Sequence, residues 1–97
     1  MKYIANAFSL QMLQGDAIVD VRTITADEFE NVKAEAISAV GHSDTAAVLG
    51  VPCNRVNITL QQGDVLYVAQ LVGGRLPEGT TTLPEGFSFK YVKLEIK

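Results

Sequence analysis

The sequence predicts a small α/β domain in which a mixed sheet of about five strands carries two or three short helices. Val65 to Val72 is a nearly continuous apolar run, typical of a central strand buried on both faces. Ala17 to Thr23 and Phe87 to Ile96 alternate between apolar and polar residues, as half-buried strands do. Helical spacing of apolar residues separates these strands. With 97 residues, 47% of them hydrophobic, we expect residues 1–97 to form a single domain.

The chain opens with a short apolar run, Tyr3 to Ala7, which we interpret as a first strand followed by a helical turn over residues 8–13 that Gly15 closes. Polar residues at a strand-to-helix junction often face a ligand, because the carboxyl end of the strand and the amino end of the helix meet there. The candidates are Asn6, Ser9 and Gln11. The alternative is that Asn6 and Ser9 only bond to nearby backbone groups.

The next helix is announced by Thr25-Ala26-Asp27-Glu28, which has the spacing of a capping box. One apolar face follows at helical spacing and predicts a helix that Gly41 ends; its members are Phe29, Val32, Ala36 and Val40. The helix dipole favours acidic residues in the first turn, so these residues indicate a solvated helix face rather than a metal site.

A second helix is predicted from Asp44 to Leu49, with Ser43 or Asp44 as its cap and Gly50 and Pro52 at its end. Residues 55–60 alternate in the pattern of a half-buried strand. A turn at 61–64 leads into the central strand. After it, glycines and a proline define a loop over residues 73–79, and residues 80–86 connect this loop to the last strand.

His42 is the only histidine, and it lies in the corner between the two predicted helices. An imidazole exchanges a proton near neutral pH without special tuning. The first backbone N–H groups of the following helix would point out beside it and offer an anion site. The residues alone leave two interpretations open, a structural histidine and an acid/base group beside bound phosphate.

Composition excludes several classes of function. A net charge of -3 argues against a protein that coats long nucleic acid. Cys53 is the only cysteine, so no internal disulfide forms, and we expect it to be a small buried apolar residue rather than a reactive thiol. One cysteine and one histidine cannot ligate a structural zinc ion, and we expect no metal or other cofactor; a magnesium ion bound by carboxylates is the alternative. No signal peptide or membrane-spanning run is present, which predicts a cytoplasmic protein.

Five ordered segments give the chain a family resemblance. They are Ala5-Asn6-Ala7-Phe8-Ser9, Val40-Gly41-His42 with Thr45, Asn54-Arg55-Val56, residues 63–70 (GDVLYVAQ) and residues 75–79 (RLPEG). In this order they resemble the small viral and mobile-element proteins known as type III anti-CRISPR ring nucleases, over roughly residues 3 to 82. The resemblance implies a homodimer that binds cyclic tetra-adenylate at its subunit interface and cuts it without a metal.

The resemblance also implies roles for individual residues. The residue matching His42 is the general acid, the one matching Glu78 orients or assists it, and the one matching Arg75 grips phosphate. We expect the ligand to be bound by Asn6, Ser9, Gln11, Ser43, Thr45, Arg55 and Gln70. For Arg55 an ion pair with an internal carboxylate is the alternative.

Two further functions stay open at this point. One is a module that sequesters a cyclic nucleotide without cutting it, and the other is a small dimeric regulator of a phage or mobile element. The predicted helix after His42 is short and no clear helix follows Gly79, whereas some members of the family have a longer helix and a helical cover there. We therefore expect an open pocket.

Overall fold

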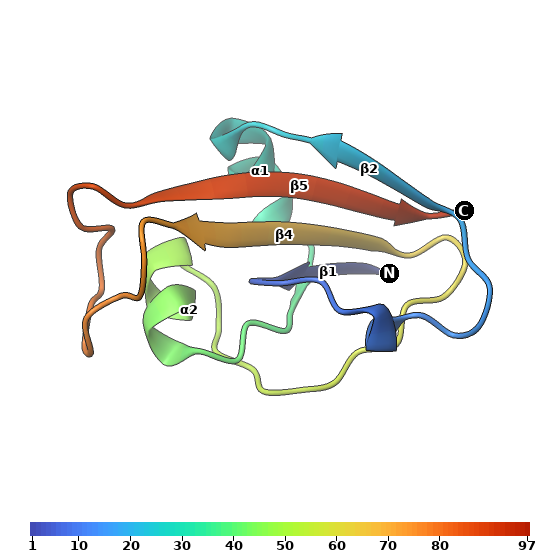
Figure 1. Ribbon diagram of the computed structural model, residues 1–97, viewed down its shortest axis with the longest axis horizontal. Coiled ribbons are helices and arrows are strands. Elements are labelled where there is room, and N and C mark those ends of the chain that lie inside the picture. The colour runs from blue at the N-terminus through green and yellow to red at the C-terminus, as the bar shows by residue number, and fades with distance from the viewer.

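The computed structural model describes residues 1–97 and has one mixed sheet of five strands in the order β2-β5-β4-β1-β3 (Figure 1). Their bounds are β1 Lys2–Ala5, β2 Val19–Thr23, β3 Ile37–Ser38, β4 Val65–Val72 and β5 Ser88–Ile96. β1 runs parallel to β3 and β4, with Ile4 opposite Tyr67, whereas β5 runs antiparallel to β4 and β2. The α/β class, the mixed sheet and the central place of Val65–Val72 are confirmed.

Three short helical segments connect the strands: η1, a 3₁₀ turn at Leu10–Met12, α1 at Ala26–Lys33 and α2 at Ser43–Leu49. Half of the predicted capping box is present: the Thr25 hydroxyl accepts a hydrogen bond from the Glu28 amide at 3.1 Å, while the Glu28 carboxylate accepts from this hydroxyl at 3.4 Å. Gly50 adopts a left-handed conformation (φ 73°) and ends α2 as expected. The sequence therefore placed both α-helix starts within two residues.

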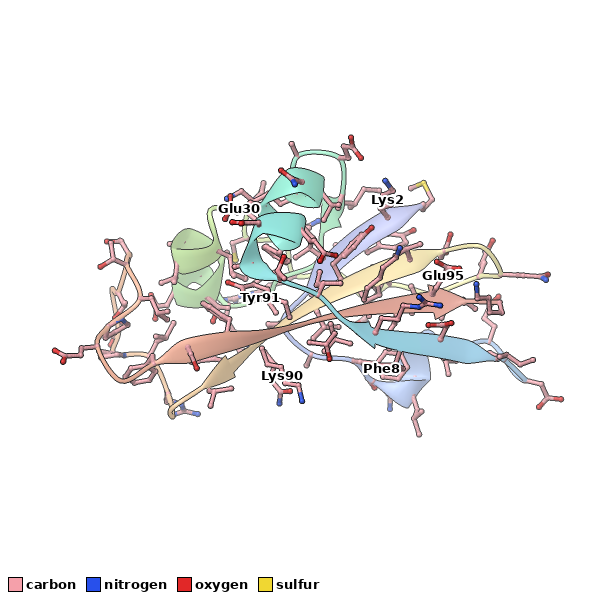
Figure 2. All side chains as sticks on the ribbon, turned by 90° about the horizontal axis from the view of Figure 1, so that it is seen from above. Lys2, Phe8, Glu30, Lys90, Tyr91 and Glu95 are labelled. Atoms are coloured by element: carbon pink, nitrogen blue, oxygen red, sulfur yellow. The ribbon has the colours of Figure 1, made fainter.

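The sheet separates two apolar layers. On one face α1 and α2 pack over Ile4, Tyr67 and Ala69, with Phe29 of α1 only 1% exposed. On the other face η1 and the extended segment 56–60 lie over Leu66, Val68 and Leu94. Figure 2 shows Tyr91 on the side of α1, and Lys90 and Phe8 on the opposite side. Helices thus cover the first face, and irregular chain covers part of the second.

The first helix is shorter than its apolar spacing predicted. α1 ends at Lys33, and Gly41 ends no helix. Instead, Ile37–Ser38 forms the edge strand β3, where Tyr3 pairs with Ile37 and the Ala39 amide donates to the Ile4 carbonyl at 2.7 Å. Val40 reaches the core as expected, with 0% exposure, but from extended chain. Backbone pairing with β1 outweighs the local helical pattern here.

The strand predicted at residues 55–60 is also absent. The segment is extended, but it meets another strand-like segment only at Leu60, whose amide donates to the Met12 carbonyl beside a bridge to Leu13. Ile58 and Leu60 pack on the second apolar layer while Val56 stays 47% exposed. One-sided burial therefore produces the alternation without a strand partner. Cys53 is exposed, contrary to the expectation of burial.

Charged side chains occupy the helix-side face of the sheet where β2 pairs with the end of β5. Arg22 donates from Nε to Asp20 at 3.0 Å, and Glu95 accepts from Lys97. The bond from Arg22 lowers the pKa of Asp20, and the bond from Lys97 lowers the pKa of Glu95. This cluster lies at the end of the molecule where β5 finishes, away from the end toward which β4 points (Figure 1).

Candidate functional site

The candidate site lies at one edge of the sheet, where the three parallel strands end. Asn6 directly follows β1, His42 follows β3 by four residues, and Gln70 and Arg75 lie near and beyond the end of β4. β4 points toward the end of the molecule that holds α2 and the loop of residues 73–87 (Figure 1). Because the carboxyl ends of parallel strands meet at one edge, segments far apart in sequence meet here.

These segments line an open cleft of about 670 Å³, and most of its lining residues are polar or charged. Its lining residues are Asn6, His42, Asp44, Thr45, Gln70, Leu71, Gly74, Arg75, Leu76 and Glu78. Six residues chosen from the sequence thus line one cleft, namely Asn6, His42, Thr45, Gln70, Arg75 and Glu78. The corner of His42 and the loop of Arg75, which sequence alone could not show to meet, are its two walls.

His42 occupies the cap position of α2 with an extended backbone (φ -109°, ψ 119°). Its side chain makes no capping hydrogen bond and is exposed. The prediction that Ser43 or Asp44 caps this helix is therefore wrong, since both lie within its first turn. Ser43 does not line the cleft. The imidazole is free to meet a ligand.

The corner that carries His42 is fastened from one side by residues 52–55. The Asn54 side-chain amide donates to the Ser38 carbonyl at 2.8 Å, and the Asn54 backbone amide donates to the Val40 carbonyl at 2.8 Å. Arg55 donates from Nε to the Gly41 carbonyl at 2.9 Å. Arg55 is thus tied to the backbone next to His42, neither in an ion pair with a carboxylate nor in the lining of the cleft. Its structural role is to hold the corner.

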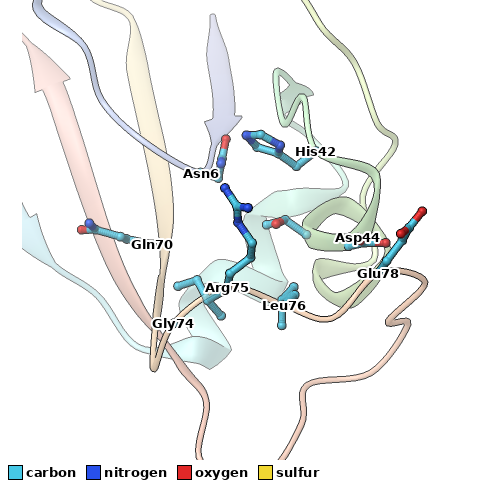
Figure 3. Close-up of a pocket in the computed structure, with 10 residues that line it drawn as sticks. Asn6, His42, Asp44, Gln70, Gly74, Arg75, Leu76 and Glu78 are labelled. Atoms are coloured by element: carbon cyan, nitrogen blue, oxygen red, sulfur yellow. The ribbon is translucent and has the colours of Figure 1, made fainter.

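Arg75 and Glu78 leave the loop in different directions (Figure 3). The Arg75 guanidinium points toward Asn6 and His42, whereas the Glu78 carboxylate points away from them, beyond Asp44. The structure contains no hydrogen bond or ion pair between Glu78 and His42. The orienting contact expected for Glu78 is therefore not formed within the chain.

Asp44 is the cleft residue to which sequence reasoning gave the wrong role. Its Oδ1 accepts a hydrogen bond from the Gly79 amide at 3.2 Å, which joins α2 to the loop. The sequence signal, an acidic residue at the start of a helix, predicted only capping. A contact across 35 positions has no local signature.

Ser9 and Gln11 do not line this cleft. They line a separate hollow of about 300 Å³ against residues 56–59. The Ser9 hydroxyl accepts from the Gln11 amide at 3.3 Å, which is the capping role left open as the alternative. Asn6 makes no side-chain hydrogen bond in the structure, so its amide is available in the cleft.

No three His, Cys, Asp or Glu side chains gather in a way that could hold a metal ion. Among the helices, none has the length and apolar character needed to cross a membrane.

Fold and site together define a small α/β protein with an open polar cleft at the carboxyl edge of three parallel strands. Residues 2–91 match the model of the STIV B116-like family, and the chain belongs to this family. The structure is similar to that of B116 of Sulfolobus turreted icosahedral virus, with a TM-score of 0.80, 20% sequence identity and 97% of each chain covered. No curated protein matches the chain. The expected relation to a viral protein is confirmed, whereas the ring-nuclease activity stays a prediction.

Proposed function

We propose that this protein is a metal-independent ring nuclease that binds and cleaves cyclic tetra-adenylate and so suppresses type III CRISPR signalling for a virus or mobile element. The observation that carries the proposal is the cleft itself. An unpaired imidazole and a guanidinium face the same space, and two free side-chain amides, those of Asn6 and Gln70, line it. The identity of the ligand, cyclic tetra-adenylate, comes from the resemblance to ring nucleases.

The cleft residues suit transfer of a phosphoryl group from the ribose 5′-oxygen to the neighbouring 2′-oxygen. The 2′-oxygen attacks the adjacent phosphorus, the bond from phosphorus to the 5′-oxygen breaks, and a 2′,3′-cyclic phosphate and a 5′-hydroxyl result. His42 donates a proton to the departing 5′-oxygen, and the 2′-hydroxyl proton passes to water. A positioned general acid contributes about 100- to 10,000-fold in rate. The cleft walls supply the remaining rate enhancement by holding the attacking and leaving oxygens in line.

Arg75 has the geometry for the phosphate. Its planar guanidinium can donate two parallel hydrogen bonds to a pair of phosphate oxygens. It points into the cleft toward His42, so both side chains face the space in which we place the phosphate (Figure 3). The Glu78 carboxylate points away from His42 and has no role in this mechanism.

A second copy of the chain completes the site in this proposal. One cleft offers one arginine, whereas a cyclic tetranucleotide carries four phosphates. Next to the cleft, on the sheet face opposite the helices, lies an apolar hollow of about 260 Å³. It is lined by Ala7, Phe8, Val68, Gln70, Val92 and Leu94. Gln70 lines both spaces, so a partner seated in the hollow would bring its own cleft alongside.

The test is incubation of the purified protein with excess labelled cyclic tetra-adenylate in the presence of a chelator. We expect linear products with a cyclic phosphate end, and a dimer by light scattering. His42→Ala should abolish turnover and keep binding, while Arg75→Ala should weaken binding. Arg22→Ala, which changes an arginine far from the cleft, is the matched control and should change neither. Absence of linear product with the unmodified protein would disprove the nuclease.

The alternative, sequestration without cleavage, has one observation in its favour, because no side chain of the same chain orients His42. Tight binding without product, and equal affinity in the His42→Ala variant, would establish it. A small regulator that binds no cyclic nucleotide would instead show no effect of Arg75→Ala on any nucleotide affinity.

A further inference from the structure

The loop of residues 73–87, which carries Arg75, is attached at three places. Its base is closed by the pairing of Val72 with Ser88 and by Gly73, which approaches the opposite end so closely that a Cβ there would lie 2.8 Å from the Gly86 carbonyl oxygen. Leu76 is 8% exposed and fixes the middle of the loop against the protein. The third attachment is the bond from Gly79 to Asp44.

The third attachment links the two walls of the cleft. Asp44 belongs to α2, two residues after His42, and Gly79 lies four residues after Arg75. Next to Gly79, the Thr80 hydroxyl and amide both donate to the Pro77 carbonyl, at 2.6 and 3.2 Å. The tip of the loop is therefore a turn with its own internal bonds, and Asp44 fixes the position of this turn.

A carboxylate is a poor lining for a cleft that receives phosphate, because it repels the ligand. Asp44 nevertheless lines this cleft, and its Oδ1 is directed to a backbone amide of the loop. We propose that Asp44 is a positioning residue, which latches the loop to α2 so that Arg75 faces His42 before the ligand arrives. The inference rests on the proposed function for the identity of the ligand, but the latch itself is a property of the ligand-free protein.

The latch and the charge of Asp44 act on affinity in opposite directions. A loop without the latch occupies the binding-competent position for a smaller fraction of the time, and the apparent affinity falls by that fraction. The ligand, once bound, restores the same arrangement, so kcat changes little and KM rises. Loss of the negative charge alone would remove repulsion and strengthen binding.

Two substitutions separate these effects. Asp44→Ala removes both the acceptor and the charge, while Asp44→Asn keeps an oxygen acceptor for Gly79 and removes the charge. Asp27→Ala is the matched control, because Asp27 holds the same second position in α1 as Asp44 does in α2 but lies away from the cleft. For cyclic tetra-adenylate we expect Asp44→Ala to bind up to about fivefold more weakly than Asp44→Asn, the factor for one net hydrogen bond, because both variants lack the charge; kcat should stay within about twofold. Asp44→Asn should bind as tightly as the unmodified protein or more tightly. Asp27→Ala should bind as tightly as the unmodified protein.

A second readout needs no ligand. Hydrogen exchange of the Gly79 amide should be about fivefold faster in Asp44→Ala and unchanged in Asp44→Asn and Asp27→Ala. If Asp44→Ala binds as tightly as Asp44→Asn or more tightly, or if Gly79 exchange is equal in all variants, the latch is overturned. If Gly79 exchange accelerates as expected but the unmodified protein binds no cyclic tetra-adenylate, the proposed function is wrong and the positioning role falls with it, leaving a purely structural contact.

Discussion

Replacing Asn54 by Asp tests how strongly the His42 corner depends on a single side-chain amide. Asn54 is half-buried and donates to the carbonyl of Ser38, which is 6% exposed. Asn54→Asp keeps the shape but sets a carboxylate oxygen against that carbonyl oxygen at about the same 2.8 Å. Removing the donor leaves the Ser38 carbonyl without this partner, and a buried acceptor left unpaired costs about 1–3 kcal/mol in all. We expect the free energy of unfolding to fall by about 1–3 kcal/mol at pH 7.

The deficit should depend on pH. A protonated carboxyl at position 54 can donate to Ser38 again, so the fold favours the protonated form and raises the pKa above the unfolded value of about 3.9. The deficit is therefore small below that value and complete at neutral pH. Urea unfolding at pH 4 and pH 7, compared with the unmodified protein, measures it. Asn57→Asp, at an exposed position without side-chain hydrogen bonds, is the control and should stay within about 0.5 kcal/mol. Equal deficits for the two variants, or one that ignores pH, would refute the reasoning.

Three further outcomes follow from the fold. Thr25→Ala should lower the free energy of unfolding by about 1 kcal/mol in urea titration, while Thr25→Ser, which keeps the capping oxygen, should lose less. Gly73→Ala should cost about 1–3 kcal/mol for its positive φ and lose more than Gly63→Ala, which has a positive φ but no atom near the new Cβ. The lowered pKa of Asp20 contributes stability above the unfolded pKa that is lost as pH falls, so Arg22→Ala should lose less stability than the unmodified protein between pH 7 and about pH 3 in thermal melts.

The sequence predicted those parts of the fold that a local pattern determines. The apolar run at 65–72 is the central strand, and the Thr25 capping box marks the start of a helix. The two wrong elements both depend on distant partners. Ile37–Ser38 becomes a strand because β1 lies beside it, and residues 55–60 fail to become one because no neighbour accepts them. Neither outcome has a local signal.

The site was predictable to a similar extent. The carboxyl ends of the parallel strands lie at one edge of the sheet, which is why Asn6, Gln70 and Arg75 join His42. Ser9 and Gln11 leave that edge because the chain turns into η1 and crosses the opposite face, and no residue pattern showed this direction. The direction of a side chain also had no sequence signal, since Glu78 lies on the same loop as Arg75 but points outward (Figure 3).

The position of β1 between β3 and β4 affects the order in which the protein can fold during its synthesis. While the ribosome makes the first half of the chain, β1 can pair only with the two residues of β3. Its longer partner, β4, emerges some sixty residues later, and β5 last of all. A nascent chain stalled before Val65 should therefore be sensitive to protease, whereas release of the completed chain should bring protection in one step.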